Sequence, residues 1–147
     1  MNPQQESPAR ARSITVLSVS PEPEDHRALY AIIRHSKWTL LEASGLASAL
    51  SLIDRHDIAV ILCERDLTPG SWTDILKYVN SLRQPPAVVV TSRLADERLW
   101  AEALNLGAQD VLVKPYDRNE VVHSVKLAWD HWFEQNEKAI QFMKAAS

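Results

Sequence analysis

Three short runs of the chain are apolar without interruption, and they constrain the fold more than any other feature. The runs cover residues 58–63, 87–90 and 111–113. A strand with one face in water alternates apolar and polar residues, whereas a strand covered on both faces reads as a continuous apolar run. Between the runs, apolar side chains recur at helical spacing, as Leu46 and Leu50 do. The pattern therefore predicts strands that alternate with helices around a buried parallel sheet.

Two further apolar runs, residues 14–19 and 39–43, bring the predicted strands to five, and a helical segment follows each of them. The predicted helices begin near residues 24, 46, 71, 96 and 117, and they end near residues 33, 53, 79, 106 and 144. Units of this kind, joined by right-handed crossovers, place helices on both faces of one sheet. We therefore expect a three-layer α/β/α sandwich.

Composition limits the classes of function. A length of 147 residues suits one domain with one core. The net charge is −3 and no basic cluster appears, which argues against a nucleic-acid surface. The longest apolar stretch is too short to span a bilayer, and the polar first residues do not form a signal peptide. Cys63 is the only cysteine and lies in an apolar run, so we expect a buried thiol and a cytoplasmic location.

Polar side chains stand where three of the predicted strands end. Glu64, Thr91 and Lys114 each follow directly after one of the three continuous apolar runs. The carboxyl ends of parallel strands meet at one edge of a sheet, and open α/β sheets bind their ligands at that edge. We therefore expect these three side chains to form the functional site.

The residues around these side chains resemble the receiver domain of two-component response regulators. Residues 107–116, with the sequence GAQDVLVKPY, are similar to the receiver segment GAxDYLxKPF. Residues 63–70 resemble the end of the third receiver strand and the loop that follows it, and Thr91 matches the hydroxyl residue of the fourth strand. These segments together identify the chain as similar to receivers, although any one of them alone is a weak signal.

The resemblance implies a fold and the limits of the domain. It covers about residues 13–133 and implies a flavodoxin-like (βα)5 sandwich with the strand order 2-1-3-4-5. Residues 1–12 are rich in Pro, Gln, Ser and Arg without periodicity, and we expect a disordered N-terminal tail there. Residues 134–147 are expected to extend the last helix.

Ser20 and Pro21 stand where the resemblance implies an acidic pair after the first strand. In receivers that pair holds Mg²⁺ together with the acceptor aspartate, and Mg²⁺ prefers carboxylate and phosphate oxygens. Glu22, Glu24 and Asp25 lie close enough in sequence to supply a ligand. Glu24 and Asp25 also suit the first turn of a helix, where the dipole stabilises acidic side chains, and we favour that role for both. We therefore expect a degenerate acidic pocket at residues 20–22, without a metal or another cofactor.

Glu64 stands at the phosphoacceptor position, where receivers carry an aspartate. Its side chain is one methylene longer, which places the carboxylate wrongly for in-line phosphoryl transfer. The carboxylate could pair with Lys114 and accept from Thr91, which would hold an arrangement close to the activated state, or it could form a purely structural ion pair. Asp66 is an alternative acceptor, and a working acceptor at either position would need Mg²⁺.

Large side chains near the end of the chain suggest a surface for partners. In receivers, the fourth helix, fifth strand and fifth helix form the usual output and dimer surface. Val111 occupies the place of the receiver's aromatic switch, so that readout is lost. Aromatic residues are enriched at protein interfaces, and the expected interface consists of Trp100, Val111, Trp129, Trp132 and Phe133.

The last predicted helix also carries a weak heptad pattern. Residues at steps of three and four run from Val122 to Met143, with Asn136 at an a-type position, as in dimers whose register is fixed by asparagine. We therefore expect a homodimer either through this helix or through the surface of the fourth helix, fifth strand and fifth helix.

These features predict a stand-alone, atypical receiver domain that acts by protein–protein contact and independently of phosphorylation. The expected partners are signalling proteins, such as a histidine kinase or a downstream regulator. A working Mg²⁺-dependent phosphoacceptor is the first alternative, and a small-molecule binder at the crevice of the sheet is a remote one. We do not expect an enzyme, because the residues above do not supply a nucleophile with its base.

Overall fold

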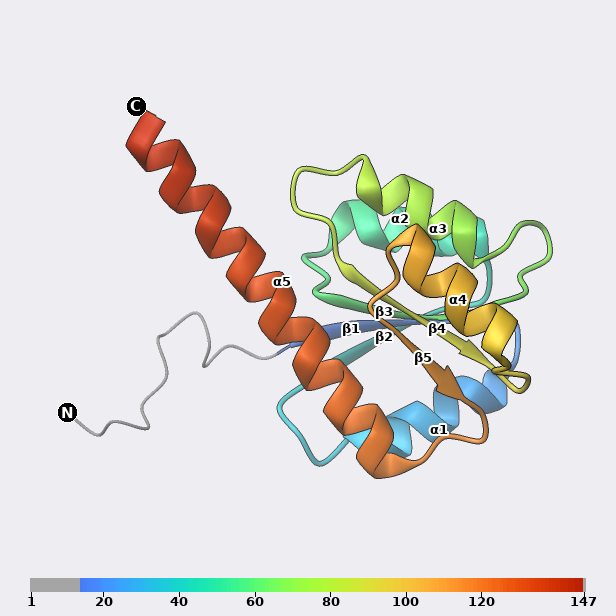
Figure 1. Ribbon diagram of the computed structural model, residues 1–147. Coiled ribbons are helices and arrows are strands. Elements are labelled where there is room, and N and C mark those ends of the chain that lie inside the picture. The colour runs from blue at the N-terminus through green and yellow to red at the C-terminus, as the bar shows by residue number, and fades with distance from the viewer. Residues whose placement is uncertain (1–13, 147) are drawn as a thin grey trace.

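The computed structural model describes residues 14–146, and the tail expected at residues 1–12 lies outside the described part. Strands and helices alternate along the chain (Figure 1). The strands are β1 (Thr15–Val19), β2 (Thr39–Ala43), β3 (Val60–Glu64), β4 (Ala87–Ser92) and β5 (Asp110–Val113). The helices are α1 (Pro23–Ile33), α2 (Leu46–Arg55), α3 (Trp72–Asn80), α4 (Glu97–Leu106) and α5 (Arg118–Ala146).

The strands form one parallel sheet in the order β2-β1-β3-β4-β5, which confirms the predicted topology. Helices α1 and α5 lie on one face of the sheet, and α2, α3 and α4 lie on the other (Figure 1). The sandwich therefore has the three layers that the apolar pattern predicts.

The central strand β3 shows why its sequence is apolar throughout. Ile61 and Cys63 belong to the core cluster under α2, α3 and α4, whereas Val60 and Leu62 belong to the cluster under α1 and α5. All four side chains are at most 2% exposed, so neither face of the strand meets water. The strand begins two residues later than predicted, because Ile58 is buried but lies before the ladder with β1.

Local signals fix the helix ends that position the site. Ser71 caps α3 by accepting from the backbone N–H of Thr73, while Asp74 accepts from the backbone N–H of Ser71. Asp96 caps α4 in the same way through the backbone N–H of Leu99. Gly107 ends α4 at φ 102°, a left-handed conformation that glycine adopts at little cost.

Three of the five residues expected at an interface are buried within the domain, which corrects that expectation. Trp129 and Phe133 stack on each other with ring centroids 5.3 Å apart and pack into the core beneath α5, each 9% exposed. Val111 is 4% exposed and lies in the core on the α4 side of the sheet. Trp129 and Phe133 are buried because α5 covers the sheet with the face that carries them. Trp132 is half-buried against this core, and Trp100 is 38% exposed.

Helix α5 continues well past the sheet (Figure 1). From residue 134 to residue 146 its side chains are exposed, except that Asn136 is half-buried. Across residues 14–146, no helix combines the length and hydropathy that crossing a membrane requires.

Candidate functional site

The predicted site residues meet at the carboxyl edge of the sheet. Glu64 is the last residue of β3 and pairs in register with Thr91 of β4. Lys114 follows β5, and its backbone N–H donates to the carbonyl of Ser92. Helix α1 begins at Pro23 beside this edge, so its first turn faces the strand ends. Four elements therefore deliver side chains to one place.

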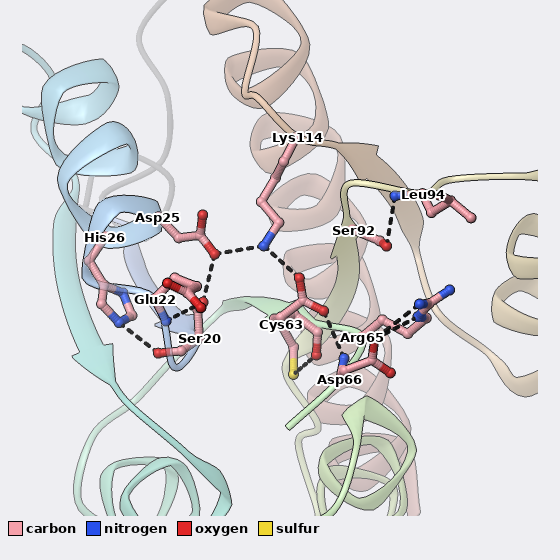
Figure 2. Close-up of polar contacts among 11 residues, drawn as sticks. Ser20, Glu22, Asp25, His26, Cys63, Arg65, Asp66, Ser92, Leu94 and Lys114 are labelled. Carbon is pink, nitrogen blue, oxygen red and sulfur yellow. Dashed lines mark hydrogen bonds and ion pairs between the residues drawn. The ribbon is translucent and has the colours of Figure 1, made fainter. Parts of the chain in front are cut away.

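Lys114 lies between two carboxylates. Its Nζ is 2.6 Å from Oε1 of Glu64 and 2.6 Å from Oδ2 of Asp25. Figure 2 shows the lysine side chain reaching across the edge toward Asp25. The side chains of Lys114, Asp25 and Glu64 are only 4%, 6% and 13% exposed, so the three charges are largely removed from water. We call these three residues the ion triad.

Asp25 corrects the sequence interpretation, which favoured a role at the start of a helix over a place in the site. It does lie in the first turn of α1, but its carboxylate enters the site instead of facing solvent. Glu24, by contrast, is exposed and pairs with Arg27 on the surface. A signal for Asp25 was available, because Asp25, Leu29 and Ile33 recur at intervals of four and all three are buried on the inner face of α1.

Ser20 anchors Asp25 from the end of β1. Its hydroxyl donates to Oδ2 of Asp25 at 2.6 Å and accepts from the backbone N–H of Glu22 at 3.1 Å. The ring of His26 binds the same corner, with Nε2 3.0 Å from the carbonyl oxygen of Ser20 and Nδ1 2.8 Å from the hydroxyl of Ser18. Because a carbonyl oxygen can only accept, Nε2 carries the proton. Of the predicted acidic pocket, Ser20 therefore belongs to the site, whereas the side chains of Pro21 and Glu22 are exposed.

Asp66 does not join the ion triad. Its side chain is 72% exposed and pairs with Arg65 at 3.0 Å. Its backbone N–H donates to Oε2 of Glu64 at 2.7 Å, so each oxygen of the Glu64 carboxylate has a donor. Figure 2 shows Asp66 paired with Arg65, away from Lys114. The structure thus places Glu64, and not Asp66, beside the lysine.

The hydroxyl of Thr91 hydrogen-bonds to Tyr116 and not to the carboxylate of Glu64. Among the described residues no hydrogen bond joins Thr91 to Glu64, which corrects that part of the expected arrangement. Burial raises the pKa of the Tyr116 phenol above its ordinary value, and the Thr91 hydroxyl offsets this effect in part. Burial also raises the pKa of the Cys63 thiol, which is 0% exposed. The thiol is therefore inert packing, as its sequence context predicts.

The residues at this edge do not fit a receiver-type Mg²⁺ site. Magnesium requires several oxygen ligands in near-octahedral geometry, commonly from carboxylates and phosphate. Here Asp25 and Glu64 both direct an oxygen at the same ammonium group, which already supplies the positive charge between them. Ser20 contributes only an uncharged hydroxyl, which donates to Asp25 and already accepts from the backbone N–H of Glu22.

Comparison with known proteins matches this geometry to a family. The sequence model of the response regulator receiver domain matches residues 16–126. The chain belongs to the receiver domain family. It is therefore a response regulator receiver domain of two-component signalling, with the CheY-like fold that its strand order indicates.

Curated relatives agree with this assignment. The transcriptional regulatory protein FixJ of Azorhizobium caulinodans is 32% identical over 70% of this chain and 53% of that protein. The transcriptional regulatory protein KdpE of Mycobacterium tuberculosis is 27% identical over 77% of this chain and 50% of that protein. The chain thus spans about half the length of these relatives.

Solved structures share the fold. The signal receiver domain of an HD domain-containing protein from Pseudomonas fluorescens Pf-5 superimposes with a TM-score of 0.79 at 20% identity, covering 93% of this chain and 98% of that one. The CheY-like receiver domain from Methanospirillum hungatei JF-1 gives a TM-score of 0.74 at 17% identity, over 84% of this chain and 98% of that one. At these identities the likeness establishes the fold alone.

Proposed function

We propose that this receiver domain transmits its signal by protein–protein contact without being phosphorylated. The observation that carries the proposal is the ion triad, in which Lys114 is 2.6 Å from both Glu64 and Asp25. Receiver domains exchange signals with histidine kinases and other signalling proteins. In this one, the lysine that would meet an incoming phosphoryl group is already neutralised by the protein's own carboxylates.

Glu64 supports the proposal by its charge as well as its length. Its carboxylate carries about one negative charge, against the ≈ −1.5 to −2 of a phosphoryl group. It binds Lys114 and the backbone N–H of Asp66, so it makes contacts at the strand edge without any modification. A second acid, Asp25, adds a charge that the family's acidic pair would otherwise bring. In the unmodified chain, the positive charge of Lys114 is therefore already balanced by the protein's own carboxylates.

The surface formed by α4, β5 and α5 is the proposed place of contact with other signalling proteins. A hollow of about 410 Å³ lies there, and Trp100, Val113 and His123 are among its lining residues. Trp100 is 38% exposed and Val113 is 44% exposed, so both present apolar area to a partner. Trp100 is the most exposed of the predicted interface residues, and half-buried Trp132 lines a different hollow, at the amino edge of the sheet.

A ¹H–¹⁵N NMR titration tests the absence of a phosphoryl switch. Mg²⁺ is added first, followed by beryllofluoride, which mimics the acyl phosphate. We expect the amide signals of Glu64, Thr91 and Lys114 to stay in place at both steps. Shifts at these amides that saturate in the millimolar range would contradict the proposal and favour a working phosphoacceptor.

Two controls make a negative titration informative. A receiver domain with the usual acidic pair and acceptor aspartate, titrated in parallel, verifies the reagents. Incubation of the chain with a small-molecule phosphodonor, followed by intact-mass measurement, checks for phosphorylation directly. An added mass of one phosphoryl group that disappears in Glu64→Gln, but persists in Asp66→Asn, would assign the modification to Glu64.

A further inference from the structure

The end of α5 exposes apolar side chains that the domain does not cover. Ile140, Phe142 and Met143 are 45%, 75% and 59% exposed. They lie in residues 134–146, which we call the α5 extension, on a helix that projects past the sheet (Figure 1). Ile140 and Met143 are three positions apart and share one side of the helix, whereas Phe142 points to another side. The extension therefore presents an apolar face, formed by Ile140 and Met143, that the rest of residues 14–146 leaves exposed.

A hollow lies beside the extension, at the amino edge of the sheet. Its volume is about 350 Å³, and its lining includes Ile14, Ala59, Trp129, Phe133 and Ile140. These residues come from the start of β1, the segment before β3, and α5. The apolar face of the extension is thus continuous with an apolar hollow at the base of the same helix.

We propose that the α5 extension and this hollow together form an interface between two copies of the chain, with the two α5 helices antiparallel. Each extension then lies against the hollow of the other copy. Under a two-fold axis the same contact is made twice, which is the usual arrangement in closed homodimers.

The area that a stable dimer needs supports this arrangement. The extension is about 20 Å long at 1.5 Å per residue. One face of so short a helix buries far less than the roughly 800 Å² per partner of a standard interface. A parallel pair of extensions would bury little more than that face. An antiparallel pair also covers the hollow, and it does so on both copies.

The charges are complementary in the same arrangement. The extension is acidic at its base, with Glu134 and Glu137, and basic toward its tip, with lysines at positions 138 and 144. Exposed Asp57 adds a further acid at the rim of the hollow, beside that base. Antiparallel helices bring the basic end of one extension toward the acidic rim of the other, whereas parallel helices place like charges side by side. No residue of this interface belongs to the ion triad, so the inference stands independently of the phosphorylation question.

Sedimentation equilibrium of the full chain, between about 5 and 200 μM, tests the proposal. We expect a monomer–dimer equilibrium in which Ile140→Glu raises the dissociation constant by about 100-fold or more. The effect is large because the two-fold axis places one new carboxylate from each copy in the interface. Leu104→Glu on α4 is the matched control, because Leu104 is 54% exposed and lies outside the interface. It should leave the dissociation constant unchanged.

The alternatives give distinct outcomes. A full chain that stays monomeric at the highest concentration overturns the proposal and indicates another occupant of the hollow, either the chain's own residues 1–13 or a different protein. Dimers broken by Leu104→Glu and not by Ile140→Glu overturn it in favour of the surface formed by α4, β5 and α5. Rapid disulfide cross-linking of Asn136→Cys would show parallel helices, because two cysteines are joined only when their Cα atoms lie within about 7 Å.

Discussion

The two edges of the sheet differ in which side chains they bury. At the carboxyl edge, the three charged groups of the ion triad are at most 13% exposed, and each is paired within the chain. At the amino edge, the apolar side chains Ile140, Phe142 and Met143 of the α5 extension are at least 45% exposed, and no other part of residues 14–146 covers them comparably. The carboxyl edge therefore buries charged side chains, whereas the amino edge exposes apolar ones. Under the function proposed above, the edge that holds the ion triad is not modified, and contacts with partners are made elsewhere on the domain.

The largest expected effect comes from removing the cation of the ion triad. Lys114→Met keeps the side-chain volume but leaves Asp25 and Glu64 facing each other without compensation. We expect the free energy of unfolding to fall by about 3–5 kcal/mol, as when one member of a buried ionic network is lost. Urea unfolding followed by circular dichroism measures this. Lys126→Met, at an exposed position on α5, is the control and should stay within about 0.5 kcal/mol of the parent.

A pair of phenylalanines sharpens the contrast along α5 itself. Phe133 is 9% exposed and stacks on Trp129, whereas Phe142 is 75% exposed in the extension. Phe133→Ala should lower the free energy of unfolding by about 3–4 kcal/mol, because it opens a cavity in the core. Phe142→Ala should change it by less than about 0.5 kcal/mol at concentrations below the dissociation constant of the proposed dimer. Equal losses in thermal or urea unfolding would show that the extension packs on its own domain.

Two neighbouring acids distinguish the site from its surroundings. Glu64→Gln removes a partner of buried Lys114, and we expect a loss of about 1–3 kcal/mol in the free energy of unfolding. Asp66→Asn removes only the exposed pair with Arg65, so its loss should stay below about 0.5 kcal/mol. If the two variants unfold at the same urea concentration, the contact of Glu64 with Lys114 does not contribute to the free energy of unfolding as its burial indicates.

The smallest expected effect is a fall in the free energy of unfolding at alkaline pH. Burial raises the pKa of Cys63 above its ordinary value of 9.0, so the unfolded thiol ionises first as the pH rises. The contribution of the buried Cys63 thiol to the free energy of unfolding is complete below pH 9. Above pH 9 it is lost progressively, by about 1 kcal/mol between pH 9 and pH 10. Cys63→Ala should flatten this part of the stability profile. A profile of unchanged slope in the variant would assign the dependence to other groups, such as Tyr116.

Sequence patterns predicted the fold well because they report local periodicity. The continuous runs in β3, β4 and β5 identified strands covered on both faces, and the segment 107–116 identified the strand order through the family. The heptad pattern of α5 was less informative, because its first half serves the core. Trp129 shows the difficulty, since a large aromatic side chain at helical spacing has the same sequence signature in a core as at an interface.

The site was predicted only in part, because its pairing is long-range. Glu64 and Lys114 were expected to meet, and they do. Asp25 lies 89 positions from Lys114, and its spacing with Leu29 and Ile33 indicates the inner face of α1 without identifying the partner of its carboxylate. The contact of Thr91 with Tyr116 was likewise missed, because a choice between two neighbouring acceptors depends on side-chain orientation.

Helix α5 begins four positions after Lys114 and runs unbroken for 29 residues. At 1.5 Å per residue it is about 43 Å long. Its first half is fixed on the sheet, since Val121, Val125 and Ala128 are 0% exposed, and only the α5 extension projects as an arm. That arm is about 20 Å long, so a tilt of about 5° at Phe133 displaces its tip by about 2 Å. A small repacking of the stacked rings of Trp129 and Phe133 is thus magnified into a larger displacement at the tip of the helix.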